Sequence, residues 1–399
     1  MENIAPIALS ATDIYLDNSA TTALSPAAKE AMLAAMESYG NPSSLHHTGQ
    51  KAAAILRHAR SQIAATLGVR TLSPEGSEIV FTSCGSEADS LALWGTVHAK
   101  PRRDANQIIS TDSEHPAVEN VLCQLEKEGW KVVRLSTRGG ALDLNQLEEA
   151  LKEKTFLVSL MMVNNETGAV YDLRTAFAMV KAHDPRTITH TDAVQGYLKL
   201  PLSPAALQAD LVTLSAHKVH GPKGVGALYL HPALIRTRSI SPFLLGGGQE
   251  AGLRSGTENI IGIAGFAAAA ADIAPHLQEN RAHMQALRDH LASRLQTIGI
   301  TVRQSAVQAP HILNLTLPDI KSETMLHFLD ARGICVSAGS ACSSHGHKTS
   351  RALAAFGVTP QEADCSLRVS FCPENTMAEV DKLAETLSEG LASLIRIRR

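Results

Sequence analysis

The sequence has no strong excess of charge of either sign, few aromatic residues and few cysteines. Its 36 lysines and arginines stand against 39 aspartates and glutamates, a formal net charge of −3, and aromatic residues make up only 4% of the chain. This balance gives no basic stripe, so we expect no direct nucleic-acid partner. Six cysteines among 399 residues, without tight pairing, do not make a disulfide scaffold. We therefore expect free thiols and a cytoplasmic location.

Long hydrophobic runs and an export signal are also lacking. The longest apolar run, Ile260 to Ala271, is too short to cross a bilayer and is interrupted by Gly262 and Gly265. The N-terminal segment MENIAPIALSATD has no basic start and no proper apolar core, so it does not read as a secretory signal. We expect no membrane partner. The composition, with 44% apolar residues, is that of a globular protein, and the length suits two or three folded units.

The first two thirds of the chain alternate short β-rich runs with stretches of helical periodicity. Strands separated by helices pair in parallel and form a sheet that is covered on both faces. The predicted fold class is therefore α/β, with a mostly parallel sheet whose ligands bind at the carboxyl ends of its strands. Seven runs are expected as its strands: Glu78–Thr82, Gln107–Thr111, Lys131–Leu135, Phe156–Val163, Thr187–Asp192, Asp210–Ser215 and Gly224–Leu230.

A second, smaller α/β domain is expected in the last third of the chain. The stretch Pro242 to Gly256, marked by glycine and proline, breaks the alternation, and a long helical pattern then runs from about His276 to Ile298. Fewer strands and longer helices follow. We place the large domain at residues 15–261. The small domain is expected to comprise residues 262–399 together with about residues 1–14.

Two charged residues stand at the ends of predicted strands. Lys218 follows the strand Asp210–Ser215 in the run SAHKVHGPKG, where a partly desolvated amine can have a lowered pKa and form a Schiff base. The alternative is a lysine of a surface loop. Asp192 ends the strand Thr187–Asp192, and a carboxylate there can pair with the pyridinium nitrogen of pyridoxal phosphate. The alternative is an ordinary helix cap.

Three further positions suggest ligand contacts. Ser83–Glu87 follows a strand and opens a helix, so its small residues can approach a phosphate, although it matches neither common nucleotide-binding glycine motif. His115 can stack on an aromatic ring or move protons, or it is an ordinary loop histidine. Arg368 lies in a strand pattern of the second domain and offers a bidentate fork to a carboxylate, or it is an edge-strand arginine in solvent.

Cys342 is the candidate nucleophile. Its surroundings, SAGSACSSHGH, are small, polar and flexible, which indicates an accessible thiol on a mobile loop. Two alternatives are an incidental surface thiol and a metal site formed with His345 and His347, for which no CxxC or HxxxH pair is present. We expect no metal here. The other cysteines that lack such a context are expected to be structural or incidental: Cys84, Cys123, Cys365 and Cys372.

Together these segments resemble the cysteine desulfurases of the NifS/IscS type, within the fold-type I pyridoxal-phosphate enzymes and the class V aminotransferase family. The resemblance covers about residues 15 to 371 in order. It is carried by YLDNSATT, YGNPSSLHHTG, EIVFTSCGSEADSLAL, SEHPAV, VNNETG, HTDAVQ, SAHKVHGPKGVGALYL, GGGQEAGLRSGTEN, SAGSAC and SLRVS.

The resemblance implies a role for each matching residue. Pyridoxal 5'-phosphate would be held by Lys218 as a Schiff base, with Asp192 at the pyridine nitrogen, Gln195 at the ring oxygen and His115 stacked on the ring. Cys342 would take the sulfur. The phosphate would be held by Gly85, Ser86, Ser215 and His217, with Thr257 reaching it from the second subunit of a homodimer. The substrate carboxylate would be bound by Asn165 and Arg368.

The implied activity is the conversion of L-cysteine to L-alanine. The sulfur would pass through a Cys342 persulfide to an acceptor protein for iron–sulfur cluster assembly or tRNA thiolation. Two alternatives remain open at this point. One is a selenocysteine lyase of the same fold, and the other is a non-catalytic metal or sulfur carrier that uses Cys342, His345 and His347.

Overall fold

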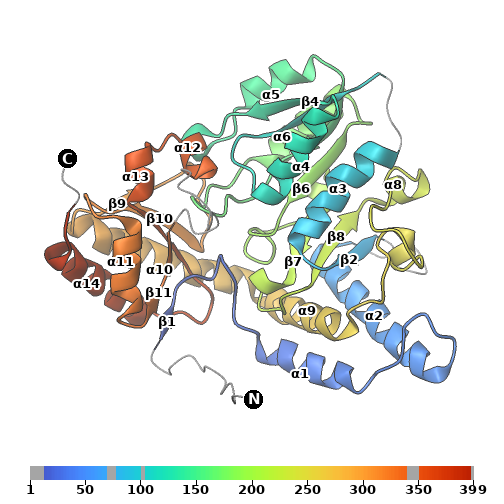
Figure 1. Ribbon diagram of the computed structural model, residues 1–399, viewed down its shortest axis with the longest axis horizontal. Helices are drawn as coiled ribbons and strands as arrows, with labels where there is room; N and C mark the ends of the chain where they lie inside the picture. Colours follow the sequence, from blue (N-terminus) through green and yellow to red (C-terminus); the bar gives the residue numbers. More distant parts are fainter. Residues whose placement is uncertain (1–12, 70–77, 100–103, 339–349, 397–399) are drawn as a thin grey trace.

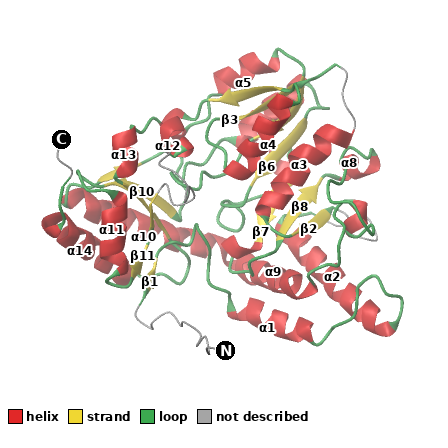
Figure 2. Cartoon of the chain, viewed as in Figure 1, coloured by secondary structure: helices red, strands yellow, loops and turns green. Residues whose placement is uncertain are grey.

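The large unit is built on a seven-stranded sheet. The computed structural model describes residues 13–69, 78–99, 104–338 and 350–396, and it divides into a large and a small α/β unit that lie side by side (Figures 1 and 2). The sheet order is β2-β8-β7-β6-β5-β3-β4. In that order the strands are β2 (Ile79–Thr82), β8 (Gly226–Leu230), β7 (Leu211–Ser215), β6 (Ile188–Asp192), β5 (Thr155–Ser159), β3 (Gln107–Thr111) and β4 (Lys131–Leu135).

The sheet is mostly parallel, as the sequence predicts. The five strands from β7 to β4 in the sheet order run parallel, while β8 pairs antiparallel with both β7 and β2. The connection from β7 to β8 contains only the short 3-10 helix η2 (Ala216–Lys218) and no helical crossover of the kind that parallel neighbours need. β8 therefore runs in the opposite direction to β7. The segment between these two strands places Lys218 at the carboxyl end of β7.

Helices cover both faces of the sheet. On one face of the sheet, buried strand side chains form an apolar cluster with α2, α5, α6 and α9. On the other face, buried strand side chains pack with α3, α4 and α8. All residues of β2, β3, β5, β6, β7 and β8 are buried, as a sheet covered on both sides requires. The helices are α2 (His47–Thr66), α3 (Gly85–Ala99), α4 (Pro116–Lys127), α5 (Leu144–Leu151), α6 (Leu173–His183), α8 (Pro232–Arg236) and α9 (Ile260–Ile273), with the short α7 (Pro204–Leu207) after β6.

The small unit has an antiparallel sheet and its own core. Its strands follow the order β12-β13-β10-β9, and β1 pairs in parallel with β11 beside them. One apolar cluster joins these strands to α10, α11 and α14. The elements are β1 (Ile14–Tyr15), β9 (Thr301–Arg303), β10 (Ile312–Thr316), β11 (Ile334–Cys335), β12 (Ser337–Ala338), β13 (Ser366–Ser370), α10 (Leu277–Thr297), α11 (Ser322–Asp330), α12 (Arg351–Phe356), α13 (Pro360–Asp364) and α14 (Met377–Ser393). The start of the described chain thus belongs to the small unit, while residues 1–12 lie outside the described residues.

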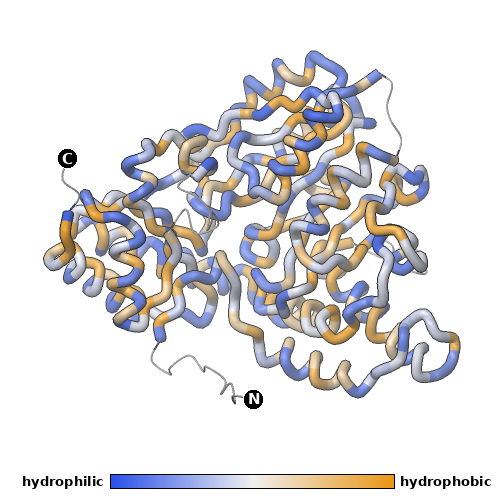
Figure 3. The backbone as a smooth tube through the Cα atoms, viewed as in Figure 1, coloured by the Kyte–Doolittle hydropathy of each residue, from blue (hydrophilic) through white to orange (hydrophobic). Residues whose placement is uncertain are grey.

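The position of α9 favours a domain boundary after this helix, later in the chain than residue 262. This helix packs against α1 (Pro26–Met36) and α2, and its Ile263, Phe266 and Ala270 belong to the core of the large unit. Its apolar character is visible along most of its length (Figure 3). A boundary at residue 262 would remove α9 from the core that it completes. We therefore propose a boundary near Ala274, between α9 and α10.

The same helix bears on the question of a membrane span. Ile260–Thr297 is long and apolar enough, by length and composition alone, to cross a membrane, and it is the one such stretch among the described residues. The stretch combines α9, which is packed in the core, with α10, whose buried Leu287 and Leu291 face the small unit. Its apolar residues are therefore accounted for by packing within the protein.

Candidate active site

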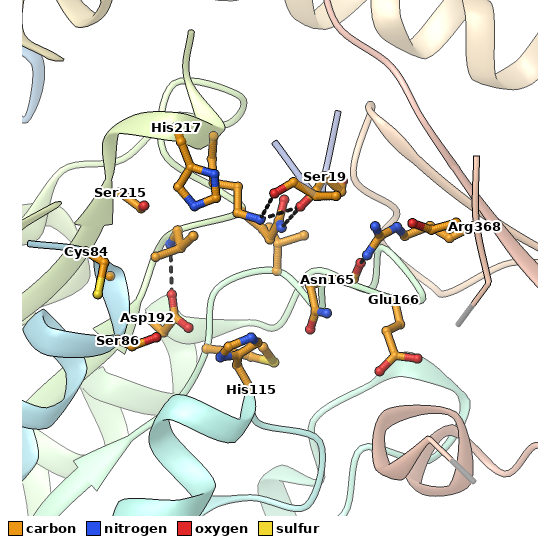
Figure 4. Close-up of a pocket in the computed structure, with 18 of the residues that line it drawn as sticks. Ser19, Cys84, Ser86, His115, Asn165, Glu166, Asp192, Ser215, His217 and Arg368 are labelled. Carbon is orange, nitrogen blue, oxygen red and sulfur yellow. Dashed lines mark hydrogen bonds between the residues drawn. The ribbon is translucent and has the colours of Figure 1, made fainter. Parts of the chain in front are cut away.

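Nearly all of the predicted site residues line one cavity of about 430 Å³ at the carboxyl ends of the large sheet's strands. Figure 4 shows its two ends: Ser215, Cys84 and Ser86 lie at one, and Asn165, Glu166 and Arg368 lie at the other, with Asp192 and His115 between them. The predicted residues that line it are Gly85, Ser86, His115, Asn165, Asp192, Gln195, Ser215, His217, Lys218 and Arg368.

The amine of Lys218 is held by backbone carbonyls from the beginning of the chain. Its Nζ donates hydrogen bonds to the carbonyl oxygens of Ser19 at 2.6 Å and Ala20 at 2.7 Å. The turn that carries Lys218 needs a small residue, since a Cβ on Gly221 would lie 2.9 Å from the carbonyl oxygen of Ala216. Lys218 is therefore fixed in the cavity by two backbone acceptors on its amine.

A second lysine, Lys199, binds the backbone of Lys218. The buried Lys199 donates from Nζ to the carbonyl oxygen of Lys218 at 2.7 Å. Burial, reinforced by the positive charge of Lys218, lowers the pKa of Lys199 to about 7. Once Lys199 has lost its proton, it anchors the backbone of Lys218 with little like-charge repulsion between the two amines.

Asp192 and His115 form the middle of the cavity. Asp192 ends β6, and its Oδ1 accepts the amide proton of Val194 at 2.9 Å. Burial raises the pKa of Asp192, and the charges of His115 and Lys218 oppose that rise. His115 is the N-cap of α4, where its Nδ1 accepts the amide proton of Ala117 at 3.2 Å, so a neutral ring carries its proton on Nε2. Burial lowers the pKa of His115 and favours that neutral form.

One end of the cavity is suited to an anion. The helix α3 begins there at Gly85, where an added Cβ would lie 2.9 Å from Val194 Cγ2 and 3.4 Å from Ser215 Cβ. The Ser215 hydroxyl is buried at this end, and the Gln195 Oε1 is buried in the cavity lining, each without a partner among the described residues. Backbone N–H groups at a helix start, with an unused hydroxyl beside them, favour a bound phosphate.

His217 lies at the same end in a neutral state. Its Nδ1 is 3.2 Å from the Thr21 hydroxyl. Burial, together with the charges of Lys218, Lys223 and Lys199, lowers the pKa of His217 to about 4. With Nδ1 facing the Thr21 hydroxyl, the neutral ring can present an Nε2–H donor to an anion without adding a charge.

The other end of the cavity is suited to a carboxylate. Arg368 comes from β13 of the small unit, and its Nη2 donates to Asp17 Oδ1 at 2.8 Å while its Nη1 donates to the carbonyl oxygen of Asn165 at 2.9 Å. Its Nε is buried without a partner among the described residues. One edge of the guanidinium is thus fixed, and a donor remains for a ligand.

Asn165 and Glu166 reach this end from a turn after β5. The side chain of Asn164 shapes the turn by accepting the amide protons of Glu166 at 3.0 Å and Thr167 at 2.9 Å. Glu166 Oε2 accepts a hydrogen bond from the Ser350 hydroxyl at 2.6 Å, which joins the two units. Burial raises the pKa of Glu166 to about 7.

Two predicted residues are not placed in the cavity. Cys342 lies outside the described residues, although Ser337 and Ala338, which precede its segment, line the cavity. Thr257 is exposed and is not among the lining residues. Its expected contact belongs to a second subunit, so that expectation stays a prediction.

Several lining residues were given no role from the sequence. Cys84 was expected to be incidental, yet it lines the anion end of the cavity, where it precedes Gly85. The backbone of Ser19 and Ala20 holds Lys218, and Asp17 orients Arg368. The available signal was the motif YLDNSATT, which contains Asp17, Ser19 and Ala20, and the motif VNNETG, which contains Glu166.

Comparisons with known proteins show the family of the chain. Residues 14–383 match the family Aminotransferase class-V. A cysteine desulfurase of Trichormus azollae is 41% identical over 381 residues, which cover 94% of this chain and 92% of the relative. A cysteine desulfurase of Enterobacter agglomerans is 38% identical over 387 residues, covering 96% of this chain and 93% of the relative.

Solved structures show the same fold. A NifS-like protein superimposes with a TM-score of 0.88 at 36% identity, covering 96% of this chain and 100% of its own. The structure of SspA in complex with cysteine superimposes with a TM-score of 0.78 at 31% identity, covering 91% and 100% of the two chains. Family match, relatives and fold together show that the chain belongs to the class-V aminotransferase family, among the cysteine desulfurases.

Proposed function

We propose that the chain is a pyridoxal-phosphate-dependent cysteine desulfurase. It converts L-cysteine to L-alanine and passes the sulfur, as a Cys342 persulfide, to an acceptor for iron–sulfur cluster assembly or tRNA thiolation. The observation that carries the proposal is the convergence of the Lys218 amine and the Asp192 carboxylate in one cavity, between an anion end and a carboxylate end. The names of the relatives, and the cysteine complex of SspA, support the substrate.

The cavity fits pyridoxal 5'-phosphate. The unpartnered Ser215 hydroxyl and the start of α3 suit its phosphate, with Gly85, Ser86 and His217 beside them. Asp192 would pair with the ring nitrogen, Gln195 with the ring oxygen and Asn165 would contact the cofactor, while His115 would stack on the ring. Bound there, the cofactor supplies an aldehyde for Lys218 and a protonated ring that accepts electrons from the α-carbon of the substrate.

The residues of the chain then divide the remaining work. Asp192 is held by the Val194 amide in a desolvated place, where it keeps a proton on its ring partner. Arg368 binds the carboxylate of the substrate, with Asp17 orienting its guanidinium. Lys218 removes the α-proton, since its amine is aimed into the cavity by the carbonyls of Ser19 and Ala20.

Cys342 carries the sulfur-transfer step. Its thiolate attacks the sulfur of the substrate, so that an S–S bond forms and the bond between the β-carbon and the sulfur breaks. The electron pair of that bond returns to the β-carbon, which takes a proton and becomes the methyl group of alanine. Cysteine and the Cys342 thiol thus give alanine and a Cys342 persulfide, with no outside oxidant or reductant. A thiol acceptor then removes the outer sulfur.

A homodimer completes the proposal. Thr257 is exposed and free to reach the phosphate end of a second subunit's cavity. Large apolar side chains are exposed in the same stretch and in the one between α1 and α2, as expected for a face that another protein covers. They are Tyr39, Leu45, Phe243, Leu244 and Leu245.

A cytoplasmic location is part of the proposal. The five described cysteines are free thiols, which suits the cytoplasm.

Mass spectrometry after exposure to L-cysteine tests the function. We expect one added sulfur atom on Cys342 together with release of alanine. Cys342→Ala should keep the colour of the bound cofactor and lose sulfide release, whereas Cys123→Ala, at a half-buried thiol on α4 outside the cavity, should behave as the parent. Normal sulfide release from Cys342→Ala would show that the thiol role is wrong. Turnover of selenocysteine but not of cysteine would favour a selenocysteine lyase instead.

A further inference from the structure

Three side chains with metal-binding atoms meet where the two units join, outside the cavity. His220 comes from the turn after Lys218, and Cys372 and Glu374 come from the segment after β13. One ligand atom from each lies within 4.8 Å of the other two. None of the three lines the cavity, and the proposed reaction uses none of them. We propose that they bind one divalent transition-metal ion, which we expect to be zinc.

The ring of His220 is oriented as a metal ligand. Its Nδ1 lies 3.1 Å from the carbonyl oxygen of Ala23, and a carbonyl can only accept, so Nδ1 carries the proton of the neutral ring. Nε2 then presents a lone pair, 3.7 Å from Glu374 Oε2. A neutral ring and a charged carboxylate then face each other with lone pairs, and a cation between them would be attracted by both. A backbone carbonyl on the other ring nitrogen is also the usual partner of a metal-bound histidine.

The backbone holds His220 in place. Its N–H donates to the Thr22 hydroxyl at 2.7 Å, and its carbonyl accepts the amide proton of Ser25 at 3.0 Å. The residue has a φ of +58°, which is uncommon outside glycine. Its side chain is only 8% exposed. The ring is therefore fixed before any ion arrives, which lowers the entropy that binding costs.

The other two ligands supply a thiol and a movable carboxylate. Cys372 donates from its amide to Asn375 Oδ1 at 2.9 Å, and its Sγ lies 3.4 Å from the same oxygen. A metal ion would replace the thiol proton, as it does in other cysteine sites. The side chain of Glu374 is 66% exposed, so an ion can enter past it and the carboxylate can close on the ion.

The donor set and the spacing suit zinc. Nitrogen, sulfur and oxygen donors together are typical of zinc, and a fourth position can hold water. Tetrahedral zinc would place the nitrogen and the oxygen about 3.4 Å apart, given bonds of about 2.1 Å. The 3.7 Å between His220 and Glu374 is close to that value. A double positive charge would also balance one thiolate and one carboxylate.

The charged neighbours set the conditions for binding. Glu374 and Asp272 act on His220 with negative charge, and Lys199 acts with positive charge. Since the pKa of Lys199 is about 7, a measurement at about pH 8 removes most of that opposing charge. A bound ion would tie the turn behind Lys218 to the end of the strand that carries Arg368, and so would join the two units.

Titration of the cofactor-loaded protein with Co²⁺ tests the site, because four-coordinate cobalt with a thiolate ligand has visible bands at longer wavelength than the cofactor. We expect one Co²⁺ per chain, competition by Zn²⁺ and a higher melting temperature with Zn²⁺. Cys372→Ser should abolish the bands, and the exposed variant Glu374→Gln should weaken binding by more than the roughly 10–100-fold cost of losing an outer-sphere partner.

A matched variant separates this site from the loop that carries Cys342. Cys342→Ser should keep the bands, although it removes the sulfur acceptor of the proposed function. Bands that survive in Cys372→Ser but vanish in Cys342→Ser would overturn the proposal and place the metal on the Cys342 loop. Absence of any band and of any Zn²⁺-dependent shift in the parent would overturn it as well. Both readouts are independent of desulfurase activity.

Discussion

The two ends of the cavity are built in different ways. The anion end comes from the large unit alone, where Ser215 ends the buried strand β7 and Gly85 follows the buried strand β2. The carboxylate end is assembled across two units, because Arg368 belongs to β13 while Asp17 and Glu166 lie in loops that meet it. The first end is positioned by one core, and the second depends on how two cores pack. Cofactor binding and substrate binding should therefore respond separately to substitution.

The largest effect is expected from Lys218→Ala, which removes the reactive group between the two ends. Alanine formation should fall by at least about 10²–10⁴-fold, and the visible absorbance of the lysine–cofactor linkage should disappear. Absorbance spectra and an alanine assay measure both. The exposed Lys223, on the same turn, provides the control, since Lys223→Ala should change neither. Retained colour in Lys218→Ala would contradict the assignment.

An intermediate effect, confined to the carboxylate end, is expected from Arg368→Ala. The loss of a charged hydrogen-bond partner for the substrate should raise KM for cysteine about 10–100-fold, since such bonds contribute about 1.5–3 kcal/mol. Cofactor colour and cofactor affinity should stay at parent values. Arg303→Ala, on β9 of the same sheet and outside the cavity, is the matched control. Loss of cofactor binding in Arg368→Ala would show that the two ends are not independent.

The smallest effect is expected from Glu166→Gln. The pKa of Glu166 is about 7 in the folded protein and about 4.3 when unfolded, so between these values the folded state binds more protons. The contribution of Glu166 to the free energy of unfolding is therefore full below about pH 4.3 and is lost as the pH rises through about 7. The Gln variant, which keeps an acceptor for Ser350, should lack this decline.

Denaturant unfolding of the cofactor-loaded proteins at about pH 5 and about pH 7.5 measures the difference between Glu166→Gln and the parent. The parent should lose more stability than the variant between these two values. Equal losses would show that Glu166 does not titrate in this range. KM for cysteine should change less than in Arg368→Ala, because the guanidinium and its partner Asp17 remain in place.

The sequence predicts the strand ends of the large sheet well, and with them the anion end. β3 and β4 have the predicted bounds. The apolar run Phe156–Val163 was too long a prediction, because β5 ends at Ser159 and the next residues are buried beside the cavity as a loop. Apolar character reports burial, and it does not separate a strand from a packed loop.

The remaining features depend on contacts that local patterns do not carry. Any residue has a carbonyl, so nothing in Ser19 or Ala20 as residue types indicates that their backbone holds an amine. The apolar residues of α9 predict a buried helix, but they do not say which core it joins. His220 and Cys372 become neighbours only because the two units pack against each other.

The path of the N-terminal segment has a consequence for how the protein forms in the cell. Asp17 and Arg368 are paired across 351 positions of chain, and β1 has its partner in β11 near the other end. Domains generally fold as they emerge from the ribosome. Asp17 can pair with Arg368 only after β13, the last strand, has been synthesised. The sheet that holds the lysine can form long before then. The carboxylate end of the cavity therefore forms only in the final stage of synthesis.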